Sequence, residues 1–317
     1  MGQLLASVRE GRSAMLIGVD WGGTKIEAIA LGEDAQPITR LREMTPRSDY
    51  EGCLAMIASL VSRVEAEAGA TGTVGVGIPG SVDPRTGIAK GASSTWLNGK
   101  PVEADLCRVL DREVRLANDA DCFAVSEAVD GAGAGHDLVF AVILGSGAGA
   151  GIAVAGKAHH GPNNSAGEWG HNPLPRPNVS EIRGPSCYCG RHGCLERWVS
   201  GWSFARDYSQ HASIDLGPSQ PLTPAEIVAR MRSGDRLAKL VWSRYVDRVA
   251  RGLSLVSNTL DPDILVFGGG MANVDELYDD LPPKLAEETF SPCFYTPITR
   301  AAHGDSSGVR GAAWLWR

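Results

Sequence analysis

Two segments of the chain repeat one design, in which an apolar, strand-like run is broken by a short turn of small residues and then resumes. The first is "IGVDWGGTKIEAIAL" at residues 17–31, and the second is "FAVILGSGAGAGIAVAG" at residues 140–156. Val and Ile lie on both sides of the glycines, which favours strand, turn, strand over a continuous helix. The repeat predicts that two parts of the chain fold on the same plan.

Both turns have a composition suited to binding anions through the backbone. Each offers N–H groups that no large side chain covers, and each adds a hydroxyl, at Thr24 or Ser146. Such concavities bind phosphate oxygens. The alternative is two plain β-hairpins without a ligand, which explains either turn alone better than it explains the pair. No stretch matches the Walker pattern, and Gly145, Gly147 and Ala150 fit the dinucleotide fingerprint only loosely, because that motif must open a helix.

Length, charge and hydropathy limit the class of protein. At 317 residues the chain is long for one core, so we expect two lobes. The formal net charge of -7 gives no electrostatic reason to expect a nucleic-acid partner. We expect a cytoplasmic protein, because the N-terminal segment is charged at Arg9, Glu10 and Arg12 and lacks an apolar run of signal-peptide length. Residues 138–156 are uncharged, but their five glycines argue against a membrane span.

Two further segments place polar or glycine residues directly after an apolar run. In "VRLANDADCFAVSEAV", Asn118, Asp119 and Asp121 precede a helical pattern, where such a cluster can simply cap a helix. Asp119 has a second use, because a carboxylate is ionised at neutral pH and can take a proton from a hydroxyl nucleophile. In "DILVFGGGMANVDELY", Gly268–Gly270 follow a strand and leave room for a nucleotide to approach.

Three of the seven cysteines, Cys187, Cys189 and Cys194, crowd into "CYCGRHGC", while the other four are scattered. Three thiolates in eight residues, with glycines that permit tight turns, can wrap a tetrahedral zinc. His171, in "AGEWGHNPLP", completes a Cys3His set, and His192 is the alternative fourth ligand. We favour His171, because an upstream ligand ties two segments together. A disulfide is disfavoured in an intracellular chain, and four protein ligands make the zinc structural.

Two glutamates stand next to the expected metal ligands. Glu168 lies three residues before His171, and Glu196 lies two residues after Cys194. The metal would hold both carboxylates close together on a rigid loop, which suits a ligand with many hydroxyl groups. The alternative is that either glutamate is a solvated surface charge.

Together these motifs resemble the ROK family of repressors and sugar kinases, within the actin and hexokinase superfamily. The segments that stand in the family's order are "GVDWGGTK", "NDAD", "LGSGAGAG", "GEWGH", "CYCGRHGCLE" and "FGGGM". The match runs from about Ile17 to the end of the chain. Four strings are similar to the bacterial fructokinase and mannokinase branch: "STWLNG", "VRLANDA", "AGEWGHNPLP" and "HGDSSGVRGAAWLW".

The resemblance implies an α/β fold of two duplicated lobes, actin/hexokinase-like (ribonuclease H-like), with a cleft between them. It implies a small N-terminal lobe at residues 1–118, to which a C-terminal helix at 306–317 returns. The large lobe, with the zinc-binding loop, would cover residues 119–305.

The resemblance also assigns roles to residues. The two turns would hold the phosphates of ATP, Asp20 would help to position Mg²⁺, and the third glycine cluster would lie near the adenosine. This set is Gly18, Asp20, Gly22, Gly23, Thr24, Lys25, Gly145, Ser146, Gly147, Gly149, Gly268, Gly269 and Gly270. Asp119 would be the general base. The sugar would contact Asn118, Asp119, Glu168, His171 and Glu196, and a structural zinc would be held by His171, Cys187, Cys189 and Cys194.

In the implied reaction Asp119 deprotonates a primary hydroxyl of the sugar for in-line attack on the γ-phosphoryl group of ATP. We expect fructose as the acceptor, and a kinase for mannose, glucose or an N-acetylhexosamine is the alternative, because a few hydroxyl contacts separate these sugars. A non-catalytic sugar-binding or regulatory member of the family is a further alternative. We expect no helix-turn-helix domain, because only sixteen residues precede Ile17. Family habit implies a homodimer.

Four positions depart from the family pattern. Ser146 stands where threonine is usual and keeps the hydroxyl. Asp121 replaces a common asparagine, and its charge would raise the pKa of Asp119 if the two side chains approach each other. Gly91 and Ser93 fall where related fructokinases often carry asparagines, so a sugar contact from this loop would be altered.

Overall fold

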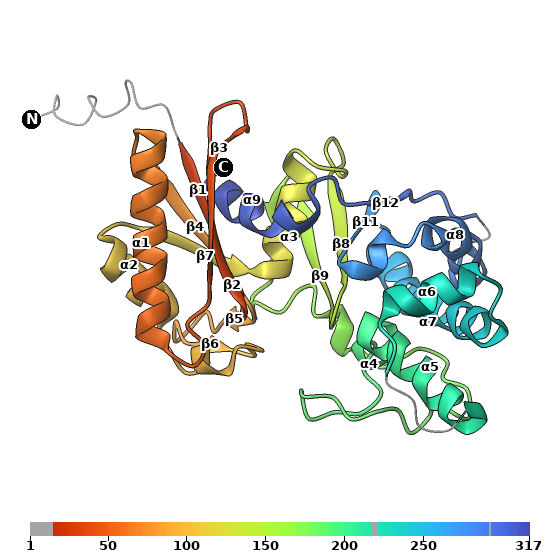
Figure 1. Cartoon of the computed structure of the whole chain (residues 1–317). Coiled ribbons are helices and arrows are strands. Elements are labelled where there is room, and N and C mark those ends of the chain that lie inside the picture. The colour runs from red at the N-terminus through yellow and green to blue at the C-terminus, as the bar shows by residue number, and fades with distance from the viewer. Residues whose placement is uncertain (1–14, 217–220, 292) are drawn as a thin grey trace, which may run out of the picture.

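The computed structural model describes residues 15–216, 221–291 and 293–317. The charged N-terminal segment discussed above, with Arg9, Glu10 and Arg12, lies outside the described residues. Figure 1 shows two groups of strands with helices between and around them. The elements run in this order: β1 (Leu16–Trp21), β2 (Lys25–Leu31), β3 (Pro37–Met44), α1 (Tyr50–Ala68), β4 (Thr73–Ile78), β5 (Ser81–Val82), β6 (Ala89–Lys90), α2 (Val102–Leu110), β7 (Val114–Asn118), α3 (Asp119–Val129), β8 (Leu138–Leu144), β9 (Ala148–Val154), β10 (Lys157–Ala158), α4 (Glu196–Val199), α5 (Gly201–Leu216), α6 (Pro224–Arg232), α7 (Arg236–Leu260), β11 (Ile264–Gly268), α8 (Glu276–Glu288), β12 (Ile298–Arg300) and α9 (Ser307–Trp314).

Two five-stranded sheets share one topology. The first has the order β3-β2-β1-β4-β7, and the second has the order β10-β9-β8-β11-β12. In each sheet the first strand along the chain pairs antiparallel with the second and parallel with the fourth. The strand, turn, strand repeat is therefore the start of each sheet, as β1–β2 and as β8–β9. The predicted α/β fold with duplicated lobes is confirmed.

The sheet order explains why distant residues meet at one edge. Strands β1, β4 and β7 are parallel, so their carboxyl ends lie at the same edge of the first sheet. Asp20 pairs with Gly77, and Gly77 pairs with Ala117, which leaves Asp119 just beyond the end of β7. In the second sheet, Gly268 at the end of β11 pairs with Ile143 near the end of β8.

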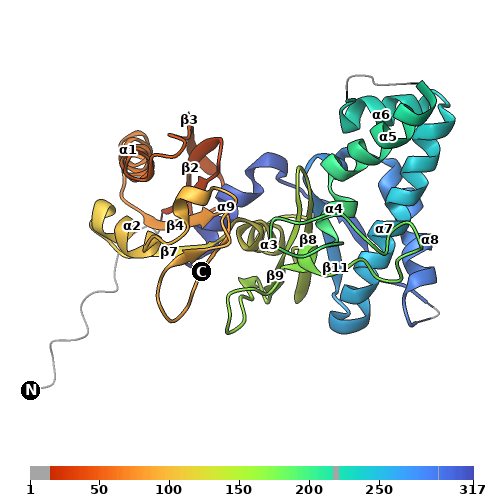
Figure 2. The ribbon, with the colours of Figure 1, turned by 90° about the horizontal axis from the view of Figure 1, so that it is seen from below.

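Helices α3 and α9 lie between the two sheets, as the two views in Figures 1 and 2 agree. They pack backbone against backbone, because glycines face the contacts. A Cβ at Gly18 would lie 1.9 Å from the Val309 carbonyl oxygen of α9, and one at Gly311 would lie 1.6 Å from the Cys122 carbonyl oxygen of α3. A Cβ at Gly151 would lie 2.0 Å from the Ala120 carbonyl oxygen. The contacts therefore run from the first sheet to α9, from α9 to α3, and from α3 to the second sheet.

Each lobe has its own apolar core on the outer side of its sheet. In the first lobe, α1 and α2 cover Ile17, Val19 and Trp21 of β1, all of them fully buried. In the second lobe, α5, α6, α7 and α8 cover the face of β8, β9 and β11 that points away from α3. The division of the chain into lobes at residue 118 remains a proposal, which this arrangement of strands supports. Among the described helices, none combines the length and the hydropathy needed to cross a bilayer.

The close contact between α3 and α9 generates a stability prediction. We expect Gly311→Ala to lower the free energy of unfolding by at least about 2 kcal/mol, because the new methyl group overlaps backbone that must move away. The matched control is Gly308→Ala in the same helix. There a Cβ would meet Asp20 only at 3.8 Å, and alanine favours helix, so stability should hold or rise. Chemical denaturation measures both variants, and equal stabilities would contradict the packing described here.

Candidate active site

The turn between β1 and β2 is a tight hairpin, and the close approach of its own backbone requires a glycine at position 22. The Gly22 N–H donates to the Lys25 carbonyl oxygen at 3.0 Å, and a Cβ at Gly22 would lie 2.9 Å from that oxygen. Arg47 donates to the Thr24 hydroxyl at 3.1 Å. Gly18, which we expected at this site, is not in the turn: it lies inside β1, opposite Ile29, and packs on α9.

The connection between β8 and β9 differs, because Gly145 in the turn and Gly149, which lies inside β9 opposite Ile143, both face open space. A Cβ at Gly145 or at Gly149 would meet no other atom within 4 Å, so neither glycine is needed for packing. A Cβ at Gly147 would lie 2.7 Å from an Oε2 atom of Glu196, so that carboxylate lies against the turn. Backbone without side chains beside open space is what a phosphate-binding turn requires.

The third glycine cluster adjoins the second turn. Gly269 has a φ of 83°, and a Cβ there would lie 2.6 Å from the Leu144 carbonyl carbon and oxygen. The Gly201 N–H, at the start of α5, donates to the Gly145 carbonyl oxygen at 2.8 Å. Between these segments lies a largely apolar cavity of about 780 Å³, lined among others by Gly145, Ser146, Gly270 and Trp202. Its size is in the range of small-molecule and cofactor sites.

Asp20 and Asp119 lie close enough for their charges to act on each other. Burial and the neighbouring Glu27 carboxylate raise the pKa of Asp20 to about 6. Solvent reaches Asp119, yet the protein around it desolvates the carboxylate, and the charge of Asp20 adds to this effect, so that its pKa is raised to about 7. Asp121 and Glu168 raise the pKa of Asp119 further, which bears out the effect expected of Asp121.

Asn118 and Asp121 are both engaged in local contacts. The Asn118 side chain caps α3 by accepting from the Ala120 N–H at 2.8 Å, and it donates to the Gly80 carbonyl oxygen at 2.8 Å. The helix-capping interpretation of this segment is therefore correct for Asn118, whatever else it contacts. Asp121 is buried, and its Oδ2 lies 2.9 Å from Nδ1 of His160, a residue that sequence analysis did not single out. This hydrogen bond raises the pKa of His160.

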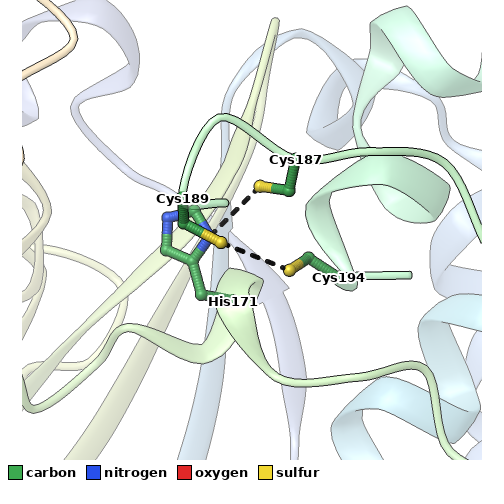
Figure 3. Close-up of side chains that lie close together, drawn as sticks. All are labelled: His171, Cys187, Cys189 and Cys194. Atoms are coloured by element: carbon green, nitrogen blue, oxygen red, sulfur yellow. Dashed lines mark hydrogen bonds between the residues drawn. The ribbon is translucent and has the colours of Figure 1, made fainter. Parts of the chain in front are cut away.

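The structure brings the expected metal ligands together. The ligand atoms of His171, Cys187, Cys189 and Cys194 all lie within 4.8 Å of one another, and His192 is not among them. Nδ1 of His171 lies 3.5 Å from Sγ of Cys187, and Sγ of Cys189 lies 3.6 Å from Sγ of Cys194, as Figure 3 shows. No disulfide forms among the described cysteines. A tetrahedral zinc, with bonds of about 2.3 Å to sulfur and about 2.0 Å to nitrogen, separates its ligand atoms by roughly 3.5–3.8 Å.

The segments that carry these ligands are fixed to α7. The indole N–H of Trp169 donates to the Gly252 carbonyl oxygen at 2.9 Å, and a Cβ at Gly252 would collide with Leu195. In the loop that precedes the cysteines, the buried carboxylate of Glu181 accepts from Arg248 at 2.8 Å and from Arg251 at 3.2 Å. Contacts with α7 therefore hold both the segment that carries His171 and the loop that precedes the cysteines.

Two candidate sugar-binding side chains, Glu168 and Glu196, lie next to the metal-ligand cluster. Oε2 of Glu168, a half-exposed side chain, lies 3.8 Å from Nε2 of His171, and the Tyr188 hydroxyl lies 2.9 Å from the same nitrogen. Oε1 of Glu196 lies 4.0 Å from Sγ of Cys187. Glu168 joins this group to Asp119, because its charge acts on that carboxylate. Among the described residues, no hydrogen bond or ion pair joins the β1–β2 turn directly to the β8–β9 turn.

The two sheets of matching topology, with Asp20 and Asp119 at the edge of the first, define an actin/hexokinase-like α/β protein. The chain belongs to the ROK family, whose sequence model matches residues 16–317. Full-length relatives include the N-acetyl-D-glucosamine kinases of Pectobacterium atrosepticum, 36% identical over 95% of this chain and 98% of that protein, and of Escherichia coli, 37% identical over 95% and 99%.

Solved structures agree with this assignment. The ROK hexokinase of Thermus thermophilus superposes with a TM-score of 0.82 and 28% identity, covering 95% of this chain and 97% of that one. A ROK family glucokinase of Streptomyces griseus, in complex with glucose and AMPPNP, superposes with a TM-score of 0.78 and 27% identity, covering 95% and 99%.

The metal ligands generate a prediction for the purified protein. We expect about one zinc per chain, and we expect Cys189→Ser to lose most of it and to melt at a lower temperature, because a structural zinc stabilises only the folded chain. Metal analysis and thermal unfolding measure these effects. Cys293→Ser, at an exposed cysteine outside the cluster, is the matched control and should keep its zinc. A metal-free wild type, or a fully loaded Cys189→Ser protein, would contradict the assignment.

The raised pKa of Asp119 generates a prediction with a definite sign. A carboxyl whose pKa is higher in the folded than in the unfolded chain destabilises the fold once pH rises above its unfolded value near 3.8, and the full penalty is present above about 7. Asp119→Asn should therefore be more stable than wild type at pH 8, by about 1 kcal/mol after solvent screening, and equal to it at pH 3.5. Denaturation at the two pH values measures this, and a gain independent of pH would refute the stated cause.

Proposed function

We propose that the protein is an ATP-dependent sugar kinase whose acceptor is N-acetyl-D-glucosamine. The observation that carries this proposal is the 36–37% identity, over 95% of the chain, to N-acetyl-D-glucosamine kinases. These relatives support an N-acetylhexosamine, the alternative acceptor in our sequence analysis, better than fructose. The Streptomyces griseus relative that binds glucose and AMPPNP supports a sugar and ATP as the two substrates.

The nucleotide would occupy the cavity beside the second turn. Gly145 and Gly270 line this cavity, and a Cβ at either would meet no other atom within 4 Å. Their missing side chains therefore leave room for a ligand and are not required by the protein's own packing. The adenosine would lie against Met271 and Trp202, and the phosphates would extend from the N–H groups of the β8–β9 turn toward the β1–β2 turn.

Asp119 would act as the general base. A primary hydroxyl of the sugar attacks the γ-phosphorus of ATP, the new O–P bond forms as the bond to the β,γ-bridging oxygen breaks, and ADP leaves. The hydroxyl proton passes to the Asp119 carboxylate. With a pKa near 7, Asp119 is a stronger base than an ordinary aspartate and is still largely ionised at slightly alkaline pH.

Asp20 fits the part of a magnesium-positioning carboxylate. It lies beside the first turn at the sheet edge that carries Asp119, and its nearest charges include the Glu27 carboxylate and the Lys25 ammonium. Mg²⁺, when bound with ATP, neutralises the phosphate charge. The bound cation would also weaken the repulsion between the Asp20 and Asp119 carboxylates. The pKa of each would then fall toward that of an ordinary aspartate.

The proposal is tested by measuring ADP release with a panel of hexoses, with and without Mg²⁺. We expect N-acetyl-D-glucosamine to give a kcat/KM at least tenfold above those of fructose, mannose and glucose, and we expect no turnover without Mg²⁺. Asp119→Asn should lower kcat by about 10²- to 10⁴-fold. A preference for fructose would restore our first expectation of the acceptor. Sugar binding without turnover would identify a non-catalytic member of the family.

A further inference from the structure

Tyr188 stands inside the metal-binding loop but is not a metal ligand. It lies between Cys187 and Cys189, in a turn in which the Gly190 N–H donates to the Cys187 carbonyl oxygen at 3.1 Å. Cys187 is buried, whereas Tyr188 is 67% exposed. A metal bound to the two neighbouring cysteines would fix the backbone here, and the phenol points outward from this turn.

The phenol contacts the nitrogen of His171 that faces away from the cysteines. Nδ1 of His171 lies 3.5 Å from Sγ of Cys187, and Nε2 lies 2.9 Å from the Tyr188 hydroxyl. The two rings meet edge to face, with centroids 5.0 Å apart and planes at 84°. When Nδ1 binds a metal, Nε2 carries the ring proton and donates it to the phenol oxygen. The orientation of Tyr188 is therefore set by a side chain that is itself held in place.

This contact leaves the phenol O–H free to donate to another group. Among the residues that the structure describes, the Tyr188 hydroxyl has no second hydrogen-bond partner. Glu168, 3.8 Å from the same His171 nitrogen, lies on its side of the imidazole. An ordinary phenol has a pKa of about 10, so it is protonated at neutral pH and can donate. Oε1 of Glu196 lies 4.0 Å from Sγ of the adjacent Cys187. A neutral donor beside two carboxylate acceptors is a suitable set of groups for binding sugar hydroxyls.

We propose that Tyr188 is a sugar-binding residue of the acceptor site, where its phenol, held by Nε2 of His171, donates a hydrogen bond to a hydroxyl of the sugar. The proposal rests on the sugar kinase function proposed above. The reacting hydroxyl is assigned to Asp119, so the phenol would contact a different hydroxyl of the sugar. Its contribution is therefore to binding, and the phosphoryl transfer step does not depend on it.

The experiment compares Tyr188→Phe with wild type, using the hexose that the panel identifies as the best acceptor. Loss of one hydrogen bond should raise the KM for that sugar about threefold to tenfold, with kcat within twofold and the KM for ATP unchanged. Calorimetric titration of the sugar without ATP should show the same fold-change in Kd. Tyr188→Leu, which also removes the ring, should raise both constants at least as much.

Two controls separate the possible outcomes. Tyr295→Phe, at a tyrosine that is 86% exposed and outside the site, should change none of these constants. Zinc content is measured for every variant, because a loss of zinc in Tyr188→Phe would show that the hydroxyl supports the metal loop only and would overturn the proposal. An unchanged KM and Kd would overturn it as well. A wild type that prefers another hexose would refute the proposed acceptor while leaving the Tyr188 comparison intact.

Discussion

Direct contact between backbones at four glycines holds the two halves of the molecule together. Gly18 and Gly75 let α9 lie against β1 and β4, Gly311 lets α9 lie against α3, and Gly151 lets α3 lie against β9. Each contact brings a would-be Cβ within 2.0 Å of a carbonyl oxygen, so no larger residue fits without separating the layers. Buried Glu127 reinforces the junction from the end of α3, because its carboxylate accepts from the Ser307 hydroxyl at 2.7 Å and from the Ala302 N–H at 2.9 Å. The position of the β8–β9 turn relative to Asp20 and Asp119 depends on this packing.

The crowded carboxylates of the candidate site destabilise the protein when no ligand is bound. Asp20, Asp119 and Glu168 bring carboxylates together, and for the two aspartates desolvation is the largest cause of the raised pKa. Such crowding stores electrostatic repulsion, which a cation and a hydrogen-bond donor can relieve. A magnesium nucleotide and a sugar offer these two groups. In the proposed reaction, relief of this repulsion would therefore favour binding of the magnesium nucleotide.

The sequence predicted the repeat and the metal ligands because both depend on local patterns. Apolar runs around glycines specify a hairpin, and three cysteines in eight residues with an upstream histidine specify a metal site. The sequence did not show that Gly18 is needed for packing. The reason is that Gly18 packs on α9, which lies almost 300 residues further along the chain. His160 and Tyr188 were missed because a lone histidine and a tyrosine between cysteines carry no spacing signal. The relatives support the alternative acceptor, an N-acetylhexosamine, better than fructose. The motifs could not separate these sugars, because few contacts distinguish hexoses and motif strings do not record them.

In the proposed site His171 would link metal binding to sugar recognition, because its two ring nitrogens face different neighbours. Nδ1 points to the cysteines, and Nε2 points to Tyr188 and Glu168. A metal on Nδ1 would fix the tautomer with the proton on Nε2, and the orientation of the phenol would follow from it. Without the metal, the proton could sit on either nitrogen, and the Tyr188 hydroxyl would have to serve as donor in one case and acceptor in the other. A structural metal bound there would thus set the hydrogen-bonding pattern of the proposed sugar site without touching it. The β1–β2 and β8–β9 turns are formed by the sheets and would not depend on the metal.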